Sequence, residues 1–236
     1  MNIFEQGKVI LIDKPLRWTS FDVIRKIRQL IKIKKVGHAG TLDPLATGLL
    51  IICTGKFTKK INEYMAREKE YTGTFTLGAT TPTYDLESEP ENFQTIVDIA
   101  DGQIIETAHK FQGEIMQVPP AHSAIKVGGR RVYELARKGE EVRLEPRKIS
   151  IADFEILKIE KPIIHFRVVC STGTYIRSLA NDFGKELNCG AFLSSLCRTR
   201  IGEFKLQDAL SIDAFEKQVK SLQNSLSQEG NGNTEL

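Results

Sequence analysis

The sequence contains no stretch approaching 18 consecutive apolar residues, and no basic segment followed by an apolar signal core begins the chain. Both absences argue against a membrane-spanning or exported protein, so we expect a cytoplasmic protein without a membrane partner. Cysteine is scarce and has no C-x-x-C spacing; it occurs at Cys53, Cys170, Cys189 and Cys197. The apolar neighbours of these cysteines predict buried, reduced thiols.

Metal-binding and nucleotide-binding patterns are missing as well. The four histidines are scattered along the chain, at His38, His109, His122 and His165. Their spacing indicates no metal site. A Gly-Lys pair ends at Lys56, but neither Ser nor Thr follows it, and its distance from Gly48 does not fit a phosphate loop. We therefore expect no metal, nucleotide or redox cofactor.

The composition is that of a globular protein of 236 residues, with 41% hydrophobic and 27% charged residues. The formal net charge of +3 is small, but the basic residues are clustered. The first cluster contains no acid and comprises Arg25, Lys26, Arg28, Lys32, Lys34 and Lys35. The others are Lys126, Arg130, Arg131, Arg137 and Lys138, and then Arg198 and Arg200. Three such clusters favour a polyanion such as RNA, although each alone is also typical of a solvated face.

Hydrophobic periodicity predicts interleaved strands and helices. The expected strands cover residues 8–13, 49–53, 70–77, 149–159, 163–170, 192–201 and 204–206. The expected helices cover residues 58–66, 103–111, 130–138 and 175–187, and a last one begins near Ser211. From Ser221 onward the chain is polar and is expected to be disordered. This pattern predicts an α+β protein rather than regular βαβ units.

A further helix is expected directly after Thr19. Thr19 followed by Asp22 is a capping-box pattern, which marks the start of a helix. Helical spacing predicts an apolar face of Phe21, Ile24, Ile27 and Ile31. The same spacing predicts outward-facing Arg25, Arg28 and Lys32. The helix would therefore present positive charge just before residue 36.

The most informative segment covers residues 36–50, VGHAGTLDPLATGLL, because it places Asp43 in a loop of small residues. Glycines such as Gly40 permit positive φ and close backbone approach. Pro44 fixes its own φ and favours an extended Asp43. Rigid loops are common places for catalytic residues, but an aspartate before proline is also a common turn former.

The sequence GHAGTLDPLATGLL resembles the signature loop of the TruB family of tRNA pseudouridine synthases. A second similar segment is Gly173-Thr174-Tyr175-Ile176-Arg177, and the resemblance runs from about Lys8 to about Ile212. It implies the pseudouridine synthase fold, a long mixed and mostly antiparallel sheet with flanking helices and a central RNA-binding cleft. It also implies a catalytic domain over residues 1–215 and a polar tail over 216–236.

The resemblance implies three catalytic residues. Asp43 corresponds to the nucleophile of the family. Tyr71 corresponds to a tyrosine that packs on the flipped base and relays a proton at uracil C5, two roles that a phenol can fill. Arg177 corresponds to the guanidinium that pairs with the nucleophile, which would keep the Asp43 carboxylate ionised and oriented.

The resemblance also implies residues that bind the substrate. His38 would contact the target nucleotide without acid–base catalysis, and Tyr71 would stack on the base. The remaining contacts would come from Tyr175 and Leu196 in the uracil pocket, Asp85 near the substrate arm, and Lys126 and Arg130 at phosphates.

The chain departs from the family pattern in two places. Arg17 stands where the family's D-K-P-x-G turn has glycine, so Arg17 should strain or reshape the turn unless it serves as a phosphate contact. Too few residues follow Ile212 for the C-terminal PUA domain of many members, so RNA affinity is expected to rest on the catalytic domain.

The implied reaction converts the T-loop uridine at position 55 of tRNA to pseudouridine after base flipping. We expect a monomer that acts on the tRNA T-arm without an obligate protein partner. Two alternatives stay open at this point. The chain could be a non-catalytic tRNA-binding or tRNA-folding module, or the catalytic subunit of a guide-RNA-directed pseudouridylation complex.

Overall fold

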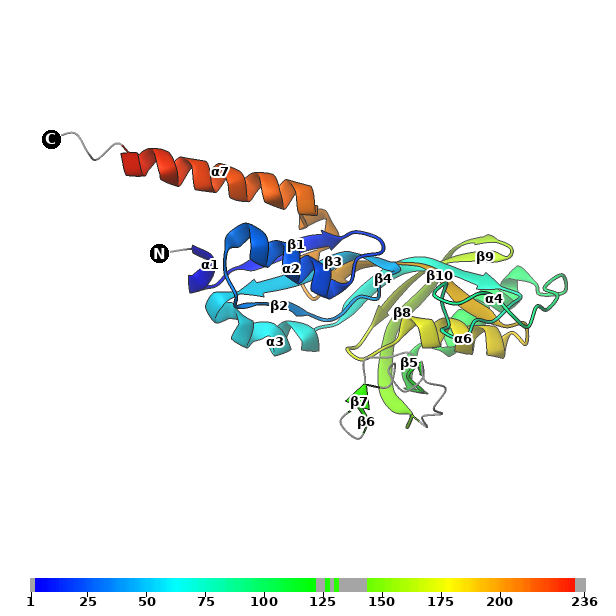
Figure 1. Cartoon of the computed structure of the whole chain (residues 1–236). Helices are drawn as coiled ribbons and strands as arrows, with labels where there is room; N and C mark the ends of the chain where they lie inside the picture. The colour runs from blue at the N-terminus through cyan, green and yellow to red at the C-terminus, as the bar shows by residue number, and fades with distance from the viewer. Residues whose placement is uncertain (1–2, 122–125, 128–129, 132–143, 232–236) are drawn as a thin grey trace. The chain divides into compact units, whose positions relative to one another are not determined.

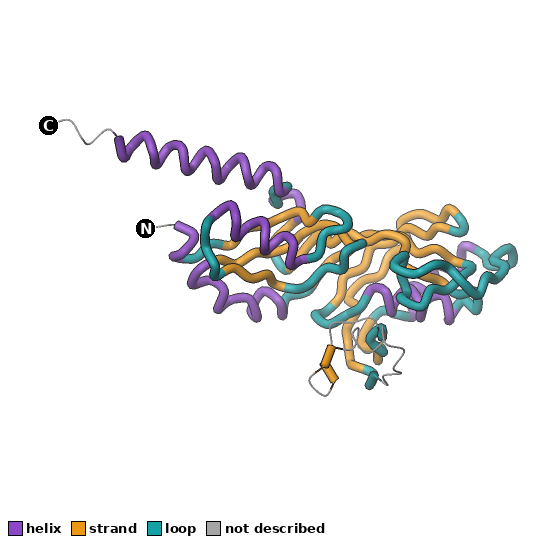
Figure 2. Tube along the Cα trace, in the orientation of Figure 1, coloured by secondary structure: helices purple, strands orange, loops and turns teal. Residues whose placement is uncertain are grey.

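A computed structural model describes residues 3–121, 126–127, 130–131 and 144–231 (Figure 1). The chain forms two compact units, of which the first combines Met1–Arg67 with Arg198–Leu236 and the second is Glu68–Cys197. In each unit helices pack on β-strands (Figure 2). The predicted α+β class is therefore confirmed. No helix within the described ranges has the length and apolar character needed to cross a membrane.

The first unit is built on strands β1, β3 and the end of β10, with β2 paired to β3 and β11 to β10. Its elements are α1 (Ile3–Gln6), β1 (Val9–Lys14), α2 (Ser20–Ile31), β2 (Val36–Ala39), β3 (Ala46–Thr54), η1 (Gly55–Lys60), α3 (Ile61–Ala66), β10 (Ala191–Ile201), β11 (Phe204–Lys205), η2 (Leu206–Asp208) and α7 (Ile212–Asn231). Strand β1 runs antiparallel to β3, with Ile12 opposite Leu50.

Strand β3 is buried on both of its faces. Leu50 and Ile52 join an apolar cluster with residues of α2 and α7. Leu49, Ile51 and Cys53 point to the opposite face, where they pack with Tyr64 of α3 and its neighbours. This alternation follows from the two-residue period of a strand, and a strand buried on both faces needs an unbroken apolar sequence.

Helix α2 begins as the capping box predicts. The Thr19 hydroxyl accepts a hydrogen bond from the amide of Asp22 (3.0 Å), and the Thr19 amide donates to the Asp22 carboxylate (2.9 Å). The predicted apolar face is wrong at one position, because Phe21 is 61% exposed. Val23 takes its place in the core, since it lies one helical turn before Ile27.

The second unit is built on the strand order β10-β4-β9-β8-β5. Its elements are β4 (Lys69–Leu77), α4 (Asp101–Lys110), β5 (Gly113–Gln117), β6 (Lys126–Val127), β7 (Arg130–Arg131), β8 (Arg147–Glu160), β9 (Ile163–Cys170), α6 (Ile176–Glu186) and most of β10. Strands β8 and β9 form the hairpin predicted around Lys161 and Pro162.

The core of the second unit is aromatic. Phe75 of β4 packs against Phe166 of β9 with ring centroids 4.2 Å apart, and against Phe183 of α6 at 5.5 Å. Phe154 of β8 meets the same Phe183 ring at 5.8 Å. These contacts hold α6 onto the strands, which fixes where the helix begins.

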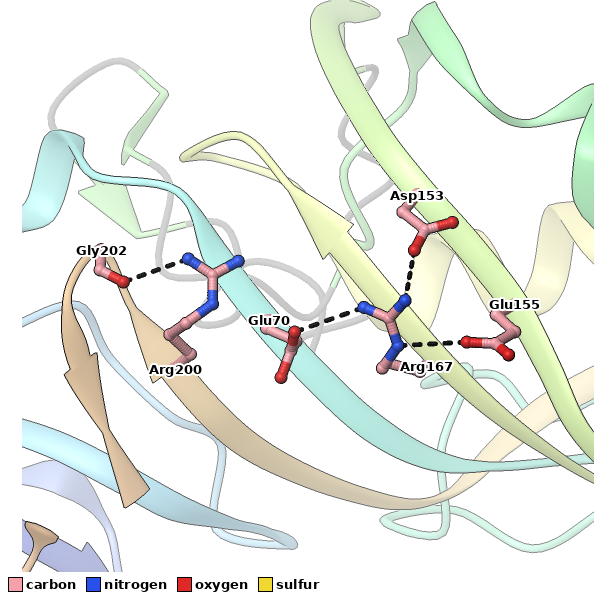
Figure 3. A network of polar contacts seen from close by, with 6 residues as sticks. All are labelled: Glu70, Asp153, Glu155, Arg167, Arg200 and Gly202. Carbon is pink, nitrogen blue, oxygen red and sulfur yellow. Dashed lines mark hydrogen bonds and ion pairs between the residues drawn. The ribbon is translucent and has the colours of Figure 1, made fainter. Parts of the chain in front are cut away.

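Three strands of the second unit are also joined by Arg167 on β9 (Figure 3). Its guanidinium contacts Glu70 of β4 (3.3 Å), Glu155 of β8 (3.2 Å) and Asp153 of β8. Glu70 directly precedes Tyr71, so this network fixes the strand beside a predicted catalytic residue.

Four local predictions need correction. Residues 58–60 belong to a 3₁₀ turn before α3, and Leu206 begins η2 rather than ending a strand. Arg130 and Arg131 form strand β7 instead of starting a helix. The Gly128-Gly129 pair before them is typical of a hairpin in the sequence. Residues 132–138 of the predicted helix lie outside the described ranges. Residues 221–231 continue α7 rather than being disordered, because adding turns to a helix already started by packed residues such as Phe215 and Val219 costs less than starting a new one.

Candidate active site

Asp43 lies in the turn between β2 and β3, and the residue before it is firmly anchored. Leu42 is 4% exposed, and its amide donates to the hydroxyl of Ser20 (2.9 Å). The same hydroxyl donates to the Leu42 carbonyl (3.2 Å). The amide of Ala46 donates to the carbonyl of Asp43 (3.1 Å), which closes the turn. The start of α2 therefore fixes the backbone that presents the carboxylate.

Lys14 holds the other side of this loop from inside the protein. Its side chain is fully buried, and the ammonium donates to the carbonyls of Pro15 (3.0 Å), Trp18 (2.5 Å) and Pro44 (3.5 Å). Burial lowers the pKa of Lys14 to about 8, although the negative charge of Asp43 opposes this shift. Sequence reasoning treated Lys14 only as part of a turn.

Arg17 adopts the left-handed conformation expected for the glycine that it replaces, with φ of 66°. Its amide donates to the carbonyl of Pro44 (2.8 Å), the same carbonyl that Lys14 contacts. The turn is therefore formed with a non-glycine residue in the left-handed region, and the Arg17 side chain is exposed.

Arg198 is a structural residue of this site that sequence reasoning misplaced in a surface cluster. It is 1% exposed; its Nε donates to the carbonyl of Leu49 (2.8 Å) and its Nη2 to that of Gly40 (3.1 Å). It thus joins the backbone on both sides of Asp43. No local pattern marks it, because the buried residues of β10 do not alternate around Arg198 and its carbonyl partners lie in distant segments of the chain.

His38 lies on β2, where its side chain is half-buried. Burial lowers its pKa, and the positive charge of Arg198 adds to this effect. Because the ordinary pKa of histidine is already near 6.5, the imidazole is neutral at pH 7. A neutral ring agrees with the predicted role of a substrate contact.

In the second unit, Arg177 is the second residue of α6 and is 5% exposed. Its Nη1 donates to the carbonyl of Thr83 (3.3 Å), and its Nε lies 3.7 Å from the Asp85 carboxylate. Asp85 is 4% exposed and accepts a hydrogen bond from the amide of Glu87 (3.0 Å). The guanidinium is thereby held in one orientation. The RNA contact of Asp85 stays a prediction.

Gln117 is a residue that sequence reasoning did not select. It is 2% exposed, and its amide forms two hydrogen bonds with the backbone of Tyr175. Oε1 accepts from the Tyr175 amide (2.8 Å), and Nε2 donates to its carbonyl (3.1 Å). Nearby, the Ser178 hydroxyl donates to the carbonyl of Val118 (2.8 Å). The last residue of β5 and the residue after it thus fix the start of α6, which carries Tyr175 and Arg177.

The other predicted residues also have defined places in the second unit. Tyr71 lies on β4 opposite Val168 and is 9% exposed, and Leu196 is half-buried on β10. Lys126 and Arg130 lie on the paired strands β6 and β7.

Asp43 and His38 belong to the first unit and the remaining predicted site residues to the second. The pairing of Asp43 with Arg177 and the cleft between them therefore stay predictions.

Comparison with solved structures places this architecture among the pseudouridine synthases. A chain in the crystal structure of a Cbf5-Nop10-Gar1 complex matches with a TM-score of 0.71 and 30% identity, over 91% of this chain and 54% of that one. A chain in an H/ACA RNP bound to a substrate RNA containing 2'-deoxyuridine matches with a TM-score of 0.69 and 29% identity, over the same shares. The chain spans about half the length of these solved chains. The predicted fold is confirmed.

Sequence relatives identify the family to which the chain belongs. The model of the TruB family pseudouridylate synthase N-terminal domain matches residues 28–176. tRNA pseudouridine synthase B of Flavobacterium johnsoniae is 54% identical over 222 residues, 91% of this chain and 97% of that protein. The protein of the same name from Phocaeicola vulgatus is 51% identical over 218 residues, 90% of this chain and 93% of that one. The chain belongs to the TruB family, as the Asp43 loop predicts.

Proposed function

We propose that this protein is a tRNA pseudouridine synthase that isomerises the T-loop uridine at position 55. The observation that carries the proposal is the 54% identity to a tRNA pseudouridine synthase B along nearly the whole length of both chains. The anchored loop around Asp43 supports it further, because an enzyme that uses a carboxylate nucleophile must hold that carboxylate in a fixed position.

In this proposal the target uridine is first flipped out of the T-loop, because its reacting atoms are out of reach inside the folded arm. Tyr71 and Tyr175 stack on or border the uracil, and Leu196 adds an apolar wall. These contacts offset the loss of stacking in the RNA. His38, as a neutral imidazole, contacts the flipped nucleotide.

Asp43 then attacks the nucleotide, and the bond between C1′ and N1 breaks. The uracil turns, a bond forms between C1′ and C5, and the bond between Asp43 and the nucleotide breaks, which frees the carboxylate. C5 loses a proton and N1 gains one, so the isomerisation needs no external oxidant or reductant. Tyr71 relays the proton at C5. Arg177 keeps the Asp43 carboxylate ionised and oriented, because a nearby cation favours the charged form.

Binding of the T-arm uses the remaining residues. Lys126 and Arg130 contact phosphates, and Asp85 lies near the arm; its position beside Arg177 also lets it orient that guanidinium. Residues 1–215 act as the catalytic domain and 216–236 as a C-terminal tail, whose first residues pack on that domain through Glu216 and Val219. We place the enzyme in the cytoplasm as a monomer, where its tRNA substrate is.

Release of tritium from a T-arm transcript labelled at uridine C5 tests the proposal, with Asp43→Asn as the matched variant. The substitution keeps the shape of the side chain but removes its charge, so we expect release by the parent protein alone and equal RNA binding by both. If the parent protein bound the RNA but released no tritium, the proposed enzymatic function would be wrong and the protein would be a tRNA-binding module. Release only after addition of a guide RNA would instead indicate a guide-directed subunit.

A further inference from the structure

The six basic residues between positions 25 and 35 separate into two groups in the structure. The first three are engaged within the first unit: Arg25 pairs with Asp22, Lys26 with Glu216, and Arg28 donates to the carbonyl of Val36. Arg25 is exposed, as predicted, whereas Arg28 is half-buried, which corrects the prediction that it faces outward. The other three residues, Lys32, Lys34 and Lys35, are therefore the better candidates for a polyanion site.

Lys32, Lys34 and Lys35 line a surface cavity of about 460 Å³ together with Lys56. The other lining residues are Glu5, Ile33 and Gly55. All four lysines are exposed, and none forms an ion pair with a residue that the structure describes. Four lysines against one glutamate leave a charge of +3, as large as the formal net charge of the whole chain. We call this cavity the basic pocket.

One wall of the basic pocket is formed by the turn after α2. Lys32 ends the helix in the left-handed conformation, with φ of 58°. The next residue, Ile33, is only 6% exposed and packs in the apolar cluster with α2 and α7. Because Ile33 is anchored inward, the turn leaves Lys32, Lys34 and Lys35 at the surface. The grouping of these lysines is therefore set by the backbone.

A second part of the wall begins at Gly55, whose amide donates to the carbonyl of Lys35 (2.8 Å). Gly55 has φ of 51°, and a Cβ there would lie 2.1 Å from the carbonyl oxygen of Glu5. Only glycine permits this close approach of three backbone segments. It brings Lys56 beside Lys35 despite the repulsion between like charges. Such a grouping is typical of a site for a polyanion.

The chemistry of the lining indicates which part of a nucleic acid would bind. Lysine ammonium groups act as point charges that bind phosphate without fixed geometry. The lining contains no aromatic side chain on which a base could stack. The basic pocket therefore suits the phosphate backbone rather than the bases.

The position of the basic pocket relative to Asp43 follows from α2. Ser20 at the start of this helix anchors Leu42, whereas Lys32 caps its end. A helix of 12 residues is about 18 Å long, so the basic pocket lies roughly that far from the Asp43 loop. We propose that the basic pocket binds phosphates of the tRNA duplex next to the reacting loop. This inference rests on the proposed function.

The test compares two double variants that each remove two positive charges. Lys34→Ala/Lys56→Ala alters the basic pocket, and Lys148→Ala/Lys158→Ala alters two exposed lysines that pair with Glu114 and Glu160. For the first variant we expect the tRNA Kd to rise about 10-fold and the slope of log K against log salt to fall by about 1 to 2. The KM should rise while kcat at saturating tRNA stays the same. The second variant should bind like the parent.

A second experiment uses a T-arm hairpin whose stem is shortened to the base pairs next to the loop. The parent and the Lys34→Ala/Lys56→Ala variant should bind it equally, because the distant phosphates are gone. A persisting difference would move the contact to the loop and overturn the duplex assignment. Saturable binding of inorganic phosphate that this variant loses would assign the pocket to a free anion instead.

An unchanged salt slope for the Lys34→Ala/Lys56→Ala variant, with an active parent, would overturn this inference alone. A parent without tritium release would overturn the proposed function first. The two failures are therefore distinguishable within one set of assays.

Discussion

The two units fix their predicted catalytic segments by different chemistry. In the first, buried cations hold the loop of Asp43, because Lys14 and Arg198 donate to backbone carbonyls on both sides of it. In the second unit, a neutral amide holds the start of α6, since Gln117 forms hydrogen bonds with both the amide and the carbonyl of Tyr175. The cores differ as well: the first unit's largest cluster is mostly isoleucine, valine and leucine, whereas phenylalanine rings meet at the centre of the second.

This difference affects how strongly each segment is held and whether its hydrogen bonds depend on pH. Hydrogen bonds from charged donors are stronger than neutral ones, but burial of the charge carries a desolvation cost. A buried lysine can lose its proton within the working pH range, whereas an amide cannot titrate. We therefore expect the first unit to be the more sensitive to loss of a side chain and the only one of the two whose site segment responds to pH near 8.

The largest expected effect is that of Arg198→Met. The substitution leaves the buried carbonyl of Leu49 and the partly buried carbonyl of Gly40 without this donor, so the free energy of unfolding should fall by about 3 kcal/mol and activity should be lost with it. Urea unfolding measures the change. Arg200→Met, two residues along the strand, should cost less than about 1 kcal/mol because Arg200 is partly exposed. Equal losses for both would contradict the anchoring role.

Gln117→Leu tests the corresponding contact in the second unit. Loss of both hydrogen bonds to Tyr175 should displace the start of α6 and lower kcat about 10-fold, with little change in tRNA affinity. Gln112→Leu, which removes a single bond from an exposed side chain, is the matched control. If tRNA affinity fell and kcat did not, Gln117 would not be a positioning residue.

Gln117→Glu adds a readout that loss of packing alone would not give. Only the protonated carboxyl group can donate to the Tyr175 carbonyl as the amide does. Burial favours this neutral form and raises the carboxyl pKa. The kcat of the variant relative to the parent should therefore recover as the pH falls. A constant ratio across the pH range would contradict the paired hydrogen bonds.

Local signals in the sequence predicted much of the fold. The capping box at Thr19 places the start of α2, and the apolar run before Thr54 identifies a buried strand, because both depend on neighbours in the chain. The resemblance around Asp43 added the fold family and the candidate nucleophile. The extension of α7 beyond Ser221 was missed, since low hydrophobicity does not distinguish a polar helix from a coil.

The supports of the candidate site were not predictable in the same way. Arg198 and Lys14 look like surface cations in sequence, but they are buried because distant strands supply the carbonyls that they bind. Gln117 meets Tyr175 across 58 positions of the chain. Such pairs depend on the register of strands far apart in sequence, for which a single chain gives no local signal.

Lys14 should give the first unit its pH dependence. The charged ammonium donates to three carbonyls, and a neutral amine has only two N–H groups, so kcat/KM should fall as the pH rises through about 8.

The contribution of Lys14 to stability should change in the opposite direction. Because the folded pKa lies below the unfolded value of 10.5, the unfolded chain binds more protons between these values. The contribution of Lys14 to the unfolding free energy therefore rises by at most about 1.4 kcal/mol per pH unit in this window.

Lys14→Met separates this contribution from those of other groups. Its unfolding free energy, followed from pH 8 upward, should lack the rise that the parent shows. Parallel curves for the parent and the variant would mean that the Lys14 pKa is not lowered in the folded protein. Gln117→Leu should leave the pH dependence of stability unchanged, since the amide does not titrate.

The smallest expected effect is that of Arg17→Gly, which restores the residue usual in the family. A non-glycine residue with φ of 66° is strained by about 1 kcal/mol, but glycine makes the unfolded chain more flexible, so the net gain in stability should be roughly 0.5 kcal/mol. Asn188→Gly, at φ of 53° in the second unit, should gain less, because asparagine tolerates this conformation. A tRNA-binding salt slope lowered by about 1 in Arg17→Gly would show that the arginine is kept as a phosphate contact despite its strain. An unchanged slope would leave the strained turn without a binding role.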